Sequence, residues 1–75
     1  MNDKYEKEIG QRIRKLRESK NMTQEMLAIK LQLLGCDITR SAVAKIEVGQ
    51  RHIYPDEIKF IKEILGVSFD SIFYD

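Results

Sequence analysis

The side chains best suited to recognition chemistry lie on the short segment that follows Thr39. If residues 40–48 are helical, a rotation of about 100° per residue gathers Arg40, Ser41, Ala44, Lys45 and Val48 on one side, and all but Val48 are small, polar or basic. Arginine and lysine match the acceptors of guanine in the major groove of DNA, and serine can contact several base edges. This side is therefore expected to contact bases, although the same pattern also describes an ordinary solvated helix face.

Two threonines indicate where adjacent helices begin. Thr23 and Thr39 each directly precede a helical pattern. A threonine hydroxyl can accept a hydrogen bond from an otherwise unpaired amide of the first turn. Helices are therefore expected over residues 24–34 and 40–48. The second of these would pack its other side inward, with Ala42, Val43, Ile46 and Glu47.

Hydrophobic spacing and end signals predict three further helices, and so an all-α fold. One helix is expected from Asp3 to Lys20, before the two described above. Another is expected after them, beginning near Pro55 and stopping at Gly66. Ser68 would cap a short fifth helix. The apolar positions of these helices are Tyr5, Ile9, Ile13 and Leu16; Leu27, Leu31 and Leu34; Ile58, Ile61 and Leu65; and Phe69, Ile72 and Phe73.

Characteristic motifs are spaced along residues 8–73. They are Ile-Gly-Gln-Arg-Ile-Arg-Lys-Leu-Arg at 9–17, Thr-Gln-Glu-x-Leu-Ala at 23–28, Ile-Glu-x-Gly-x-Arg at 46–51 and Leu-Gly-Val-Ser-Phe-Asp-Ser-Ile-Phe at 65–73. Together they resemble the lambda-repressor-like, or XRE, family of helix-turn-helix proteins. The resemblance implies a compact five-helix bundle in which residues 40–48 form the recognition helix, inserted into the major groove.

The resemblance also implies roles for single residues. Family members read bases with positions that match Arg40, Ser41 and Lys45, and the glutamine that matches Gln24 commonly binds a phosphate. Phosphate contacts fix the register of a protein on DNA, whereas base contacts carry the sequence information. Further phosphate contacts are expected from Thr23, Arg51 and His52, with an ordinary surface role as the alternative for His52.

An ion pair between the first helix and the recognition helix is a further implication of the resemblance, through Arg17 and Glu47. The helical stripes permit it, because each residue borders the apolar side of its helix. If the pair is partly buried, loss of one partner costs roughly 3 to 5 kcal/mol. If it is exposed, the loss is about 1 kcal/mol or less.

The chain departs from the family pattern between the second and third helices. Gln32 stands where the family usually has a turn glycine, and the glycine appears only at Gly35. We expect the second helix to continue through Leu34, with Gly35 as a left-handed cap and residues 36–38 as a lengthened link. The angle between the two helices is the property that this lengthening could alter.

Composition indicates one small globular domain, residues 1–75. The chain is 43% apolar and 33% charged, with a net charge of +1. Residues 1–20 hold seven Lys or Arg against four Asp or Glu, whereas residues 52–75 hold two against five. The basic end can provide the local positive field that phosphate binding needs. The sequence has neither an apolar run of membrane-spanning length nor a secretion signal, and the resemblance implies a cytoplasmic, bacterial or phage-type setting.

The inventory of reactive residues argues against an enzyme. There is a single cysteine, Cys36, and a single histidine, His52, so neither a disulfide nor a metal-ligand cluster can be built. Cys36 is expected at a turn or half-buried, with a redox-sensing thiol as the alternative. No catalytic group, metal or cofactor is expected.

Some apolar residues exceed what one small core can hide, and surplus apolar surface often marks an interface. A homodimer is expected, since two recognition helices would meet half-sites one DNA turn apart. The alternative is that these residues complete the core. Those expected in the interface are Phe60, Ile64, Phe73 and Tyr74, and Ile29 and Leu33 belong to the same surplus.

Three classes of function remain open. The first is a sequence-specific transcriptional regulator, expected to be a repressor that occupies promoter DNA at an inverted-repeat operator. The second is a small controller or antitoxin type of regulator whose main partner is another protein. The third is a protein-interaction module that has kept the fold and lost DNA binding.

Overall fold

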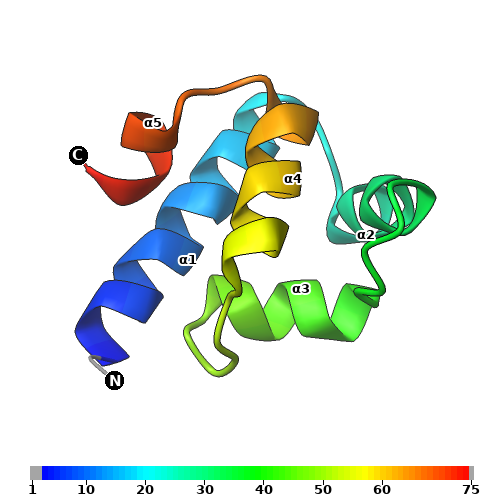
Figure 1. Ribbon diagram of the computed structural model, residues 1–75. Helices are drawn as coiled ribbons and strands as arrows, with labels where there is room; N and C mark the ends of the chain where they lie inside the picture. Colours follow the sequence, from blue (N-terminus) through cyan, green and yellow to red (C-terminus); the bar gives the residue numbers. More distant parts are fainter. Residues whose placement is uncertain (1–2, 75) are drawn as a thin grey trace.

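Five helices follow one another along residues 3–74, the part of the chain that the computed structural model describes (Figure 1). They are α1 (Asp3–Ser19), α2 (Gln24–Leu33), α3 (Arg40–Glu47), α4 (Pro55–Leu65) and α5 (Phe69–Phe73). The all-α prediction is confirmed, with helix ends close to the expected ones. Residues 1, 2 and 75 of the expected domain lie outside the described residues. Within the described range, every helix is too short or too polar to cross a membrane.

The predicted caps begin and end these helices. The hydroxyl of Thr23 accepts a hydrogen bond from the amide of Met26 at 3.0 Å, and that of Thr39 accepts one from Ala42 at 3.1 Å. Gly35 has φ of +84° just beyond α2, which confirms the expected left-handed turn. The other end signals are confirmed too: Pro55 in the first turn of α4, left-handed Gly66 at its end, and Ser68 as the cap of α5.

The core lies where the inner sides of the five helices meet. Four residues at the predicted apolar positions are exposed: Tyr5 (63%), Leu34 (46%), Phe69 (45%) and Phe73 (39%). Leu34 is exposed because α2 ends at Leu33, so the turn at Gly35 carries it away from the inward side. Cys36, which we expected at most half-buried, and Ile38 fill the interior instead. The buried apolar residues are Ile13, Leu27, Ala28, Leu31, Cys36, Ile38, Val43, Ile46, Ile61, Leu65 and Ile72.

The backbones of α1 and α3 cross in close contact at Gly10. A Cβ atom at this position would overlap the carbonyl oxygen of Ile46 and would lie 2.9 Å from that of Glu47. Only glycine therefore allows the two helices to approach this closely. The crossing holds α3 against the middle of α1, and α3 lies below the beginning of α4 with one long side toward the outside (Figure 1).

Candidate nucleic-acid interface

The outward side of α3 carries the residues that were expected to read bases. Arg40, Ser41 and Lys45 are exposed, and Ala44 between them is half-buried. The opposite side packs into the core, with Val43 and Ile46 buried. Because the helix is short and capped by Thr39, its first turn is held in place from its first residue. The sequence-derived division of α3 into a packed and a free side is therefore present in the structure.

The ion pair expected between Arg17 and Glu47 is present and buried. Nε of Arg17 donates to Oε2 of Glu47 at 2.7 Å, and Nη2 donates to Oε1 at 3.0 Å. The remaining Nη1 donates to the carbonyl of Met22 at 2.7 Å. Hydrogen bonding to Glu47 raises the pKa of Arg17 more than burial lowers it. The guanidinium thus stays charged and ties α1 to α3 and to the turn before α2.

Gln24, an expected phosphate contact, also binds this carboxylate. Its Nε2 donates to Oε1 of Glu47 at 3.0 Å, and its side chain is half-buried at the beginning of α2. An amide nitrogen has two hydrogens, so one donor remains after this bond is made. The side chain that was expected to bind the DNA backbone is therefore oriented by α3.

An open groove of about 550 Å³ begins beside this network. It lies between the second half of α1 and the beginning of α2, where Thr23 and Gln24 form part of its wall, and it reaches Arg40. Arg14 also lines it and lies 3.6 Å from Glu18 in an exposed ion pair. Two carboxylates, Glu18 and Glu25, share the groove with these cations. A DNA backbone can bind in the groove only at points where the positive charge of the arginines exceeds the negative charge of these carboxylates.

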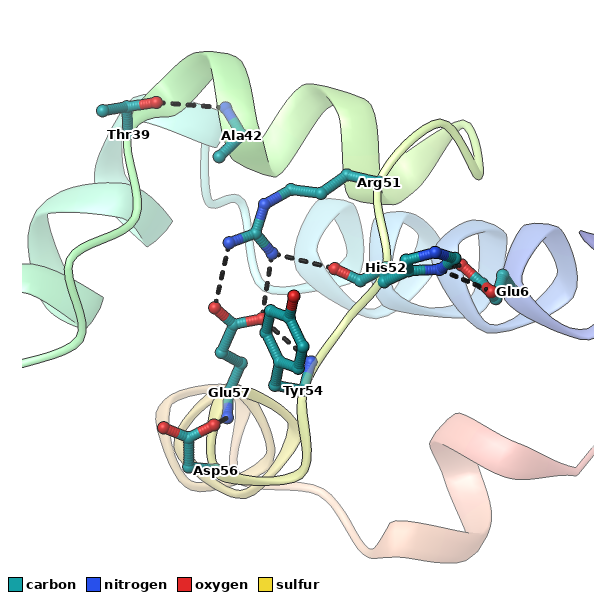
Figure 2. A network of polar contacts seen from close by, with 8 residues as sticks. All are labelled: Glu6, Thr39, Ala42, Arg51, His52, Tyr54, Asp56 and Glu57. Carbon is teal, nitrogen blue, oxygen red and sulfur yellow. Dashed lines mark hydrogen bonds and ion pairs between the residues drawn. The ribbon is translucent and has the colours of Figure 1, made fainter. Parts of the chain in front are cut away.

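Arg51 and His52, the other expected phosphate contacts, lie in the loop after α3, and each contacts a carboxylate from a helix (Figure 2). Nη1 and Nη2 of Arg51 donate to the two oxygens of Glu57 on α4, at 2.9 and 3.1 Å. Nδ1 of His52 lies 2.7 Å from Oε2 of Glu6 on α1. The structure therefore places these two residues away from the groove and in contact with their own partners.

Glu57 is held by more than Arg51. Its Oε1 also accepts the amide hydrogen of Tyr54 at 3.0 Å, which caps α4. Burial alone would raise the pKa of the Glu57 carboxyl, but the hydrogen bonds from Arg51 and Tyr54 outweigh burial and lower that pKa. Hydrogen bonding to Glu57 likewise raises the pKa of Arg51. Both groups therefore remain charged, and the pair is neutral as a whole.

Sequence reasoning missed several of these contacts. The pairing of Arg51 with Glu57, the pairing of His52 with Glu6 and the bond from Gln24 to Glu47 were not expected. One signal was available for α4: a Glu at the third helical position, here Glu57, can accept the amide hydrogen of the N-cap residue, which is one half of a capping box. Gly10 within a helical pattern was a second signal, since an isolated helical glycine often marks close packing.

Comparison with known proteins agrees with this geometry. The family model described as helix-turn-helix matches residues 13–72. A curated relative, Control protein C.BamHI of Bacillus amyloliquefaciens, is 42% identical over 59 residues, which is 77% of this chain and 67% of the relative. No solved structure matches the chain. The chain belongs to the lambda-repressor-like helix-turn-helix family of DNA-binding transcriptional regulators.

Proposed function

We propose that this regulator is sequence-specific and inserts α3 into the major groove, where Arg40, Ser41, Ala44 and Lys45 contact bases. The observation that carries the proposal is the two-sided α3: its cations are exposed while Val43 and Ile46 are buried. An arginine can make a bidentate contact with guanine, and a small residue such as Ala44 allows the helix to approach the base edges.

The phosphate contacts are proposed for the groove beside the beginning of α2. Thr23, Gln24 and Arg40 line it, so one strand of the backbone could pass there while α3 meets the bases. Gln24 keeps a donor for this purpose after its bond to Glu47. Arg51 and His52 are less suited to the task, because a carboxylate already binds each of them.

A homodimer is the proposed DNA-binding form, since two copies of α3 can meet half-sites separated by about 34 Å. Phe73 and Tyr74 support it, because they are 39% and 69% exposed at the end of the chain. Phe60 and Ile64 contribute less apolar surface than the sequence suggested, since both pack partly against the core. Sedimentation that finds only monomer at high micromolar concentration, with and without DNA, would overturn the dimer.

Occupation of promoter DNA by such a small protein would repress transcription by blocking access. A controller role is the second candidate, favoured by the relative whose name is Control protein C.BamHI. The two candidates share α3 and differ in their main partner. A protein that co-purifies with the chain would separate them, because the repressor needs only DNA whereas the controller type has another protein as its main partner.

Selection of bound duplexes from a random pool tests the proposal directly. We expect recovery of an inverted repeat, with half-site spacing of about one helical turn. Lys45→Ala should weaken binding and relax the sequence preference at its half-site position, and Lys59→Ala on α4 is the matched control. Enrichment of no common sequence, or equal selection by the Lys45→Ala variant, would contradict the proposal.

A further inference from the structure

We propose that Arg51 is a positioning residue that fixes the end of α3 through Glu57, and that it does not bind a DNA phosphate. The inference rests on the proposed DNA-binding function and deepens it. It concerns the loop from Val48 to Tyr54, which connects α3 to α4 and lies between both helices and α1 (Figure 2).

The guanidinium of Arg51 makes three hydrogen bonds within the protein, through Nη1 and Nη2. Besides its two hydrogen bonds to Glu57, Nη1 donates to the carbonyl of His52 at 2.9 Å. Its planar group also lies 5.9 Å from the centre of the Tyr54 ring. An arginine that binds a carboxylate through two nitrogens is oriented by geometry as well as by charge.

Release of Arg51 toward DNA would leave Glu57 without its cation. Only 9% of the Glu57 side chain is exposed. A buried carboxylate that loses its partner is strongly destabilised, because little water can replace the missing hydrogen bonds. Since the pair is neutral as a whole, it also adds little to the attraction between the protein and a phosphate backbone.

The loop transmits this anchoring to the base-contacting side of α3. The amide of Gln50, next to Arg51, donates to the carbonyl of Lys45 at 2.8 Å. Gly49 has φ of +77°, and a Cβ atom there would lie 3.0 Å from Cα of Lys7. The end of α3 is thus enclosed between α1 and the anchored loop. A shift of the loop would change the direction of the last turn of α3 and of Lys45 on it.

Three variants distinguish positioning from phosphate binding, measured on the duplex that the wild type selects. Arg51→Lys keeps the charge but loses the bidentate geometry, Arg51→Gln loses both, and Glu57→Gln removes the carboxylate while keeping an acceptor for the amide of Tyr54. Glu63→Gln is the control, because it removes an exposed carboxylate from the same helix. Circular dichroism ensures that each variant is compared below its own unfolding transition.

For a positioning role, we expect all three variants to bind the duplex about tenfold more weakly. This corresponds to a loss of about 1.4 kcal/mol in binding free energy. The slope of log affinity against log salt should stay at the wild-type value. The Arg51→Gln, Glu57→Gln double variant should be no worse than either single variant, since one interaction is removed in each case.

If Arg51 instead binds a DNA phosphate, the variants should behave differently. Arg51→Lys would bind like the wild type, Arg51→Gln would reduce the salt slope by about 0.9, and Glu57→Gln would bind more tightly because it frees the guanidinium. Any of these results, or unchanged affinity in all three variants, overturns the inference while leaving the proposed function in place. If the wild type selects no duplex, the proposed function fails and the inference with it.

Discussion

Arg17 of α1 and Glu47 of α3 form a bidentate ion pair with only 9% and 1% of their side chains exposed. Glu47 also accepts a hydrogen bond from Gln24, so α1, α2 and α3 meet at one carboxylate. Because both ions are shielded from water, each depends on the other for the interactions that solvent would otherwise provide. The beginning of α2 and the end of α3 are therefore held in a fixed relation.

Arg17→Met tests this dependence. The substitution leaves a buried carboxylate with Gln24 as its remaining side-chain donor. We expect the free energy of unfolding, measured by urea denaturation, to fall by roughly 3 to 5 kcal/mol. The control is Arg14→Met, which breaks an exposed pair with Glu18 and should cost about 1 kcal/mol or less. Equal small losses in the two variants would show that burial of the pair contributes nothing.

Gly10→Ala tests the crossing of α1 and α3. In an ordinary helix interior this change would stabilise the protein by about 0.5 to 1 kcal/mol. Here the added methyl group would meet the backbone oxygen of Ile46, which cannot rotate away as a side chain can. We expect instead a loss of about 1 to 3 kcal/mol in urea denaturation. The exposed neighbour Gln11→Ala should stay within about 0.5 kcal/mol of the wild type, and a stabilised Gly10→Ala variant would refute the close crossing.

The helices and the two sides of α3 could be predicted because their signals are local. Thr23 and Thr39 act on amides three residues away, and apolar spacing alone separates Val43 from Lys45. Leu34 was mispredicted because the periodic pattern continues for one residue beyond the regular helix. The partner of Arg51 could not be predicted, since it depends on the path of a loop that brings it beside α4. For this reason the sequence predicted Arg51 as a phosphate contact, although its guanidinium is bound to Glu57 in the structure.

Thr39→Ala tests the cap of α3. Its hydroxyl accepts the amide hydrogen of Ala42, and loss of such a cap costs about 1 kcal/mol. Because α3 has only eight residues, fraying of its first turn should also disorder Arg40 and Ser41 and weaken DNA binding. Thr39→Ser keeps the hydroxyl and should retain both stability and affinity. Loss of affinity in the serine variant would point to a direct role for the methyl group instead.

The pH dependence of stability should report the hydrogen bonds at Glu57. Since Arg51 and the amide of Tyr54 lower the pKa of this carboxyl despite its burial, the folded state binds its proton less readily than the unfolded state. The ionised Glu57 carboxylate therefore stabilises the folded state fully at pH values above its pKa in the unfolded chain, about 4.3. This stabilisation is lost as the pH falls through the lower pKa that Glu57 has in the folded protein. We expect the difference in unfolding free energy between the wild type and Glu57→Gln to shrink between about pH 6 and pH 3. A difference that stays constant over this range would mean that the charge of Glu57 does not stabilise the anchored loop, and that Arg51 is held there by packing alone.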